Sequence, residues 1–203
     1  MNQQSFGLAI ILNFNMKTLQ ESILSSTKSG KDKLYADNPS MHLKDIFASD
    51  DLQVRKIDGI KNKYTVYGNT PKKEIEIDES WPDIEITYLS ITTNHGHQLI
   101  YKIKGQKSFD KFLSIFAPSG SSSEYLGSYH GIPSFDTKFI IENCTVDYDK
   151  LPLLAGIVKL KNVKFKMSSN GWSSKIKGEL HMKNCTEPQL PTILSGLSVF
   201  KKS

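Results

Sequence analysis

Few side chains in this sequence have the types and spacing that enzymatic chemistry requires. His95 and His97 stand two residues apart, and His130 follows Ser128 by two residues in GSYHG. Imidazole pairs bind zinc, and a serine beside a histidine can act as a nucleophile. Zinc needs further ligands, however, and the serine lacks the G-x-S-x-G turn of a nucleophile elbow. The sequence therefore predicts a polar turn at 95–97, no catalytic set and no metal site.

A cluster of carboxylates around Trp81 offers a second route to acid–base chemistry. Its members are Asp78, Glu79 and Asp83. A charge-rich turn of this kind is usually solvated, and neither a phosphate-binding glycine loop nor a dinucleotide fingerprint is present. We therefore predict a protein with no enzymatic activity and no cofactor. A hydrolase or metal enzyme using the histidines above is an alternative hypothesis.

The positive charge of the sequence is unevenly distributed along the chain. The chain of 203 residues has a formal net charge of +5, and residues 135–203 supply that excess with eleven lysines against six carboxylates. Arg55 is the only arginine, whereas nucleic-acid-binding proteins favour arginine because its planar fork matches phosphate and guanine edges. Lysine still attracts phosphate as a point charge. The preferred partner is therefore a protein with an acidic surface, and a nucleic acid is the alternative.

The element expected to display these lysines is a short repeat near the C-terminal end of the sequence. The stretches FIIENC, VKLKNV and LHMKNC begin at Phe139, Val158 and Leu180. Each places two apolar residues at alternate positions, then a charged residue, then Asn, then Cys or Val. The two cysteines of the chain, Cys144 and Cys185, occupy the last position, so we expect small buried thiols there.

A longer alignment of four units supports the repeat. Aligned on Pro133, Pro152, Ser174 and Pro191, the units lie 19, 22 and 17 residues apart. Alternate residues of a strand face one side, so each unit predicts one strand whose apolar face is buried by stacking on its neighbours. The aligned apolar positions are Phe135, Leu154, Ile176 and Ile193, then Phe139, Val158, Leu180 and Leu197, then Ile141, Leu160, Met182 and Val199.

This pattern resembles that of leucine-rich-repeat proteins, in particular the short irregular repeats of phage and bacterial genomes. The resemblance covers residues 131–203, although the common pattern has one more residue between the second apolar position and the asparagine. It implies a β solenoid whose outward strand face binds a partner.

An antiparallel hairpin turning at Asn170-Gly171 is the alternative arrangement of the same strands. It would place Lys166 opposite Lys175 and Lys164 opposite Lys177, and like charges opposed across strands are unfavourable. The parallel repeat is therefore preferred.

The outward positions of the predicted solenoid form the candidate binding surface. In-register stacking would place Lys161 and Lys183 on one ribbon, with Glu142 beside them. A basic ribbon of this kind fits an acidic partner. The candidate binding residues are Lys159, Lys161, Lys175, Lys177, His181 and Lys183, with Trp172 as a candidate exposed anchor.

Upstream of the repeat, periodicity predicts a mixed α+β region. Helices are expected at 17–26, after Asn38-Pro39 with Leu43, Ile46 and Phe47 inward, and after Ser108 as N-cap with Phe109, Phe112, Leu113 and Phe116 inward. Strands are expected at 74–77, 84–92 and 98–104, and Asp58-Gly59 predicts a type I′ hairpin turn.

The expected architecture is therefore α+β and β-rich, with an N-terminal α+β region followed by a short leucine-rich-repeat-like β solenoid. Four parts are predicted: an N-terminal arm at 1–30, an α+β region at 31–118, a Gly/Ser-rich loop at 119–131 and a repeat module at 132–203.

The stretch MKTLQESILSSTKSGK, which begins at Met16, resembles an N-terminal segment found on otherwise different proteins of bacteriophages that infect gut Bacteroidetes. The resemblance implies a phage-encoded protein and makes Met16 an alternative start to Met1. The apolar run Gly7 to Phe14 is too short to cross a bilayer. We therefore expect no membrane association, and a location in the host cytoplasm or in the virion.

Overall fold

The structure, a computed structural model, describes residues 35, 38–94, 97–116, 126, 128–129, 132–133, 136–147, 150–166, 175–186 and 197–202. Met1–Pro39 and Ser40–Ser203 are separate compact units, and the fold below is that of the second unit. The helix expected at 17–26 and the alternative start at Met16 lie outside the described residues. No helix in the described ranges is long and apolar enough to span a membrane.

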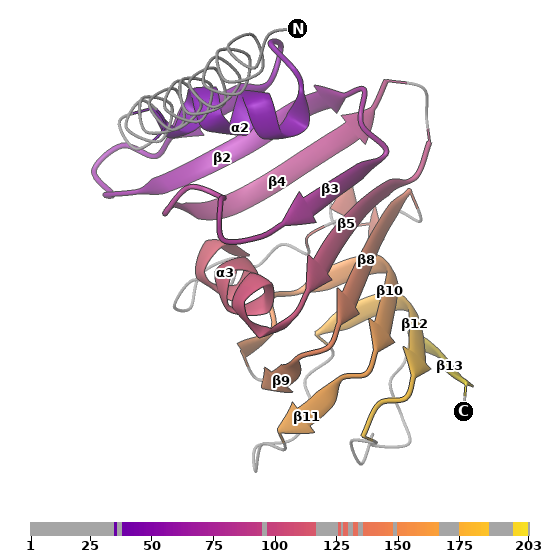
Figure 1. Ribbon diagram of the computed structural model, residues 1–203. Helices are drawn as coiled ribbons and strands as arrows, with labels where there is room; N and C mark the ends of the chain where they lie inside the picture. Colours follow the sequence, from indigo (N-terminus) through magenta and orange to yellow (C-terminus); the bar gives the residue numbers. More distant parts are fainter. Residues whose placement is uncertain are drawn as a thin grey trace, which may run out of the picture. The chain divides into compact units, whose positions relative to one another are not determined.

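The chain folds as a β solenoid of about four turns, built on a six-stranded sheet in which every pairing is parallel (Figure 1). This confirms the predicted α+β class with a solenoid. The sheet includes strands from both sides of the 119–131 segment, so the stacking starts further upstream than the predicted repeat. Its strands, in sequence order, are β3 (Glu74–Ile77), β5 (Leu99–Lys104), β8 (Thr137–Glu142), β10 (Leu154–Lys161), β12 (Ile176–Lys183) and β13 (Leu197–Lys202).

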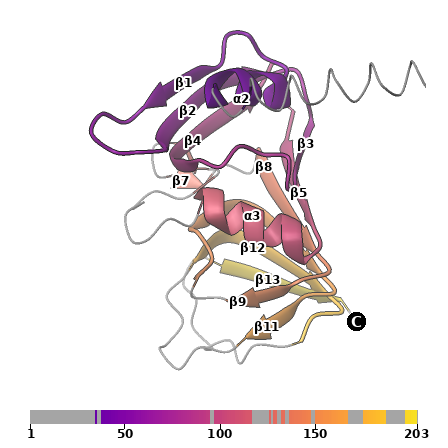
Figure 2. The ribbon, with the colours of Figure 1, turned by 60° about the vertical axis from the view of Figure 1, so that its left-hand side comes forward.

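A second side of the solenoid is built from three different elements in succession (Figure 2). Strands β1 (Gln53–Lys56), β2 (Lys63–Thr70) and β4 (Glu85–Thr93) form a three-stranded sheet. Helix α3 (Gln106–Phe116) comes next, followed by the parallel pair of β9 (Thr145–Asp147) and β11 (Lys164–Lys166). The remaining described elements are helix α2 (Pro39–Phe47) and the short strands β6 (Ser128–Tyr129) and β7 (Ile132–Pro133).

The inner face of the six-stranded sheet stacks apolar side chains in rows, as the repeat alignment predicts for its first three units. One row contains Phe139, Val158 and Leu180, and a second contains Ile141, Leu160 and Met182. All six side chains are buried. The rows continue upstream into β5, where Tyr101 stacks on Phe139 with ring centroids 5.3 Å apart.

The fourth unit of the alignment was wrong by two residues. Val199, and not Leu197, stands opposite Leu180, while Leu197 pairs with Gly178. A slip of two residues keeps the same side chains on the same face, because the strand period is two. Hydrophobic pattern alone therefore cannot detect this error. The aligned positions Phe135 and Ile193 lie outside the described residues.

The chain turns at an asparagine directly after each of the strands β8, β10 and β12. Asn143, Asn162 and Asn184 adopt positive φ angles of 56°, 53° and 53°. Their side chains form a ladder in which Nδ2 of Asn162 donates to Oδ1 of Asn143 at 2.8 Å and Nδ2 of Asn184 donates to Oδ1 of Asn162 at 3.3 Å. Asparagine tolerates this left-handed conformation and supplies both a donor and an acceptor. Gly105 takes the equivalent place after β5, with φ 87°.

Aromatic side chains dominate the core at the β3 end of the solenoid. Trp81 packs edge-on against Phe47 of α2 and Phe116 of α3, each at a centroid distance of 5.9 Å. Helix α2 begins at Pro39 as predicted, with Leu43 and Phe47 buried. Helix α3 begins earlier than predicted, because Gly105 ends β5 and its carbonyl already accepts the Phe109 N–H at 3.1 Å. Ser108 is therefore inside the helix and is not its N-cap.

Two predicted hairpins have different outcomes. β1 and β2 do pair antiparallel, but the Ile57 N–H bonds the Lys63 carbonyl at 2.9 Å. The connection is therefore longer than a two-residue type I′ turn at Asp58-Gly59. The alternative hairpin at 170–171 is excluded, because β11 pairs parallel to β9 and β12 pairs parallel to β10. Its turn residues lie outside the described part of the chain.

Candidate binding site on the outward face of the sheet

Four of the candidate binding residues meet on the outward face of the six-stranded sheet. Lys159 stands opposite His181, and Lys161 stands opposite Lys183. Glu142 pairs with Lys161 from the other side, as expected from in-register stacking. Lys177 is exposed near the start of β12 and Lys175 precedes that strand. Trp172 lies outside the described residues.

The outward side chains of β8, β10 and β12 form a regular lattice. Neighbouring strands lie about 4.8 Å apart and alternate residues about 6.8 Å apart along each strand. Lys138, Lys159 and Lys183 occupy one diagonal of this lattice, and we call these three residues the lysine track. The lattice consists of Lys138, Ile140 and Glu142 on β8, Ile157, Lys159 and Lys161 on β10, and Glu179, His181 and Lys183 on β12.

Both carboxylates of the lattice already have partners. Glu142 Oε1 lies 3.5 Å from Lys161 Nζ, and Glu179 Oε2 lies 2.8 Å from His181 Nε2. Within the described ranges, by contrast, no member of the lysine track forms an ion pair. The described side chains therefore leave the positive charge along this diagonal uncompensated.

Lys138 shows the electrostatic consequence of this arrangement. Partial burial of its ammonium group and the neighbouring charge of Lys159 both lower the pKa of Lys138 below its ordinary value. An anion placed between the two lysines would favour the charged form and reverse this shift. The site is therefore electrostatically suited to a negatively charged ligand.

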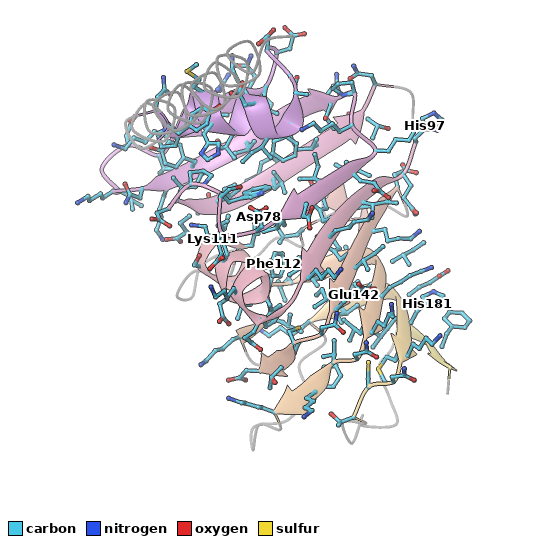
Figure 3. The ribbon with its side chains drawn as sticks, viewed as in Figure 1. Asp78, His97, Lys111, Phe112, Glu142 and His181 are labelled. Atoms are coloured by element: carbon cyan, nitrogen blue, oxygen red, sulfur yellow. The ribbon has the colours of Figure 1, made fainter. Side chains whose placement is uncertain are left out.

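A groove of about 450 Å³ lies over the same part of the sheet. Glu142, Lys161 and Lys183 line one part of it, and Ile140, Lys159 and His181 line another. Leu160, Met182 and Phe200 complete the lining. The ring of Phe200, on β13, stacks on His181 with centroids 4.6 Å apart and planes 18° apart. Glu142 and His181 project from the side of the sheet away from the core residue Phe112 (Figure 3).

Sequence reasoning missed several residues of this surface. Lys138, Ile140 and Ile157 alternate with buried residues along β8 and β10, so the strand period could have identified them. Phe200 was missed because the fourth unit was misaligned, which moved it away from His181. Phe200 is 49% exposed, so part of its apolar surface is available for contact.

Of the three histidines considered for catalysis, His97 alone lies within the described residues. The carbonyl of His97 accepts a hydrogen bond from Thr93 Oγ1 at 2.6 Å, whereas His95 and His130 lie outside the described residues. Among the described side chains, no group of three or more His, Cys, Asp or Glu residues is placed to hold a metal ion.

Two of the three carboxylates around Trp81, Glu79 and Asp83, form ion pairs with lysines of helix α3. Asp83 forms an ion pair with Lys111, and Glu79 lies 3.4 Å from Lys107 (Figure 3 labels Lys111). Asp78 Oδ1 accepts the backbone N–H of Ser80 at 2.9 Å, as in a turn. These contacts give the cluster a structural role.

Comparison of the chain with protein-family models, curated proteins and solved structures finds no match. The β solenoid is therefore established by the structure alone. Neither the leucine-rich-repeat resemblance nor the phage resemblance gains support from these comparisons.

Proposed function

We propose that this protein is a non-enzymatic binding protein that docks an acidic surface of a partner protein onto the lysine track. The observation behind the proposal is a contrast within one lattice. The carboxylates Glu142 and Glu179 are paired, whereas the three track lysines have no ion-pair partner among the described residues. A partner that supplies carboxylates would relieve the mutual repulsion of the lysines and gain charge-assisted hydrogen bonds.

The scaffold supports this role because it holds the lysines at fixed spacing. Each lysine extends from a hydrogen-bonded parallel strand, and the residues directly behind the lattice are buried. A rigid surface loses little conformational entropy on binding beyond that of the lysine side chains. Electrostatic docking of this kind gives fast association that weakens as salt rises.

Affinity capture from expressing cells tests the proposal. The bait is compared with the double variant Lys159→Gln/Lys183→Gln and with the matched control Lys56→Gln/Lys61→Gln, which removes two exposed lysines at the β1–β2 hairpin. We expect wild type and control to recover the same acidic protein at low salt, and the track variant to lose it. Recovery of no track-dependent protein, together with turnover in a broad hydrolase screen, would overturn the proposal.

Nucleic-acid binding is the second candidate, and the His181–Phe200 ring stack beside the lysines favours it. Nucleic-acid bases stack on aromatic rings while lysines contact phosphates. If three lysines each contact a phosphate of a single strand, the logarithm of the affinity should fall with the logarithm of salt concentration with a slope of about −2. Fluorescence anisotropy with a labelled single-stranded oligonucleotide measures this slope. Absence of binding at about 50 mM salt would exclude this candidate.

The phage origin implied by the N-terminal resemblance is also part of this proposal. Under it, the partner belongs to the bacterial host or to the virion. Mass spectrometry of infected cells tests the origin, and the first residue of the recovered protein distinguishes a start at Met1 from one at Met16.

A further inference from the structure

We propose that the lysine track, together with the groove that Lys159 and Lys183 line, takes an acidic peptide segment that also presents apolar side chains, and not a bare polyanion. This inference rests on the proposed function and names the chemistry of the partner surface. Three features of this face of the sheet lead to it: the placement of Ile140 in the groove and of Ile157 beside it, the exposure of Phe200, and the length of the lysine track.

The isoleucines occupy positions where a solvated sheet face normally has polar residues. Ile140 and Ile157 are outward-facing and half-buried, and in the lattice each is a direct neighbour of Lys159. An exposed sheet face is usually polar on its solvent side. Apolar side chains on both sides of a track lysine therefore indicate a surface that is covered in the functional complex.

Phe200 extends this apolar character to the far wall of the groove. One face of its ring is occupied by His181, yet the side chain is still 49% exposed. A phosphodiester backbone offers no apolar group to Ile140 or Ile157. A peptide with leucine or a similar side chain between its carboxylates can bury these surfaces while it neutralises the lysines.

The length of the track fits a short segment of chain. Each diagonal step combines one strand spacing and one two-residue step, which gives about 8 Å per step and about 17 Å from Lys138 to Lys183. An extended peptide covers that distance in about five or six residues. Lysine side chains are long and flexible, so they can follow carboxylates that recur along such a segment.

Two synthetic peptides of equal length and charge test the inference on the full chain. In one, glutamates are separated by leucines; in the other, serines replace the leucines. We expect the leucine peptide to bind about fivefold more tightly or better, which corresponds to burial of part of one or two apolar side chains. Fluorescence anisotropy at low salt measures both affinities.

Matched variants locate the site. Lys159→Gln and Ile140→Thr should each weaken the leucine peptide by about fivefold. The controls Lys61→Gln and Ile60→Thr, both in the exposed β1–β2 connection, should leave its affinity unchanged. Threonine preserves the β-branched shape that a strand favours, and circular dichroism melting confirms folding. Should Ile140→Thr not fold, Ile157→Thr on β10 and Phe200→Ala on β13 test the same apolar contribution to peptide affinity.

The outcomes separate this inference from the proposed function. If both peptides bind equally and Lys159→Gln weakens both, the site is a simple polyanion surface; the inference is then wrong while acidic-partner binding stands. If neither peptide shows Lys159-dependent binding but a single-stranded oligonucleotide does, both are overturned in favour of nucleic acid.

Discussion

The two ends of the six-stranded sheet differ in how many of their lysines pair with a carboxylate. At the β3–β5 end, Lys102 Nζ lies 2.5 Å from Glu74 Oε2 on the neighbouring strand. In the separate three-stranded sheet, Lys63 of β2 likewise pairs with Glu85 of β4 at 2.7 Å. At the β8–β12 end, the lysine track has no such partners among the described residues. Lysine therefore connects strands at both ends, through Lys102 at one and Lys161 at the other, and at the β8–β12 end the three track lysines also present their charge to the solvent side.

The cores behind the two ends differ as well. Behind β3 and β5 lie the large aromatic side chains of α2, α3 and Trp81, whereas behind β8, β10 and β12 the rows are mostly aliphatic. Gln106 joins the two regions: its side-chain Oε1 accepts the Thr145 N–H of β9 at 2.8 Å. Helix α3 thus supplies the acceptor for the Thr145 N–H of β9. A strand paired with β9 on that side would otherwise supply this acceptor.

The largest expected loss of stability comes from a substitution at Gly178, where β10 and β12 approach each other closely. A Cβ at this position would lie 2.3 Å from the Gly156 carbonyl oxygen, and φ is +112°. Gly178→Ala should therefore lower the free energy of unfolding by about 3–5 kcal/mol, through steric overlap and backbone strain. Urea unfolding measures the loss.

Gly59→Ala is the matched control for that substitution. Gly59 also has a positive φ, of +75°, but a Cβ added there, in the β1–β2 connection, would have no atom within 4 Å. This substitution should cost about 1 kcal/mol through strain alone. Equal losses of unfolding free energy in Gly178→Ala and Gly59→Ala would show that the steric overlap between β10 and β12 adds nothing to the backbone strain.

Much of this fold follows from local sequence rules. The alternation of apolar residues around Phe139, Val158 and Leu180 predicts the strands, and the asparagine after each strand predicts where the chain turns. These rules work because stacked strands bury one face and because asparagine accepts the left-handed conformation. The parallel register of the first three units therefore follows directly from the sequence.

Other features depend on contacts that a single sequence does not reveal. β3 and β5 join the same sheet although helix α3 and a long connection separate β5 from β8, so no fixed period relates them. The candidate site was only partly predicted for a related reason. Lys138 is distinguished by partial burial and by the nearby charge of Lys159, and both depend on which side chains the fold brings near it.

The asparagine ladder gives the second-largest expected effect. Asn162 bonds a neighbour on each side, with Asn143 and Asn184 as its partners. Asn162→Ala should cost about 2 kcal/mol, because it loses exposed hydrogen bonds and places alanine at positive φ. Asn162→Gly should recover about half of that loss, since glycine relieves the backbone strain.

The β5 turn supplies the contrasting substitution. Gly105 has φ 87°, with no atom within 4 Å of an added Cβ. Gly105→Asn should therefore change the free energy of unfolding by only a few tenths of a kcal/mol, because asparagine tolerates this conformation. A loss as large as that of Asn162→Ala would contradict the equivalence of the two turns. Chemical denaturation of the three variants in parallel provides the measurement.

Alkaline pH should weaken the β8–β12 end through Cys144. Burial, with smaller contributions from Asp110 and Cys185, raises the pKa of the Cys144 thiol to about 12. Between the ordinary thiol pKa of 9.0 and about 12, the folded protein keeps a proton that the unfolded chain releases. The stabilising contribution of the protonated Cys144 thiol is therefore fully present below pH 9. As the pH rises from 9 towards 12, the free energy of unfolding falls by at most about 1.4 kcal/mol per pH unit.

Cys144→Val isolates that contribution, because Val163 occupies the equivalent place in the next turn of the solenoid. The variant should lose less stability between pH 9 and pH 10.5 than wild type does, by about 1.6 kcal/mol. Cys185→Ala, at the partly buried thiol, should retain most of the wild-type dependence. Parallel pH dependences for wild type and Cys144→Val would contradict the assignment.

The smallest expected effects have opposite signs at the two ends of the sheet. Lys102→Gln removes the pair with Glu74 and should lower the free energy of unfolding by about 0.2–1 kcal/mol, since the two side chains are 43% and 52% exposed and the pair is screened by solvent. Lys159→Gln removes repulsion on Lys138 and should raise it by a few tenths of a kcal/mol. NMR titration should show the pKa of Lys138 rising toward its ordinary value in Lys159→Gln and unchanged in Lys102→Gln. Destabilisation by Lys159→Gln would mean that this lysine stabilises the fold through a partner. The contrast between paired Lys102 and the lysine track, which is unpaired among the described side chains, would then be wrong.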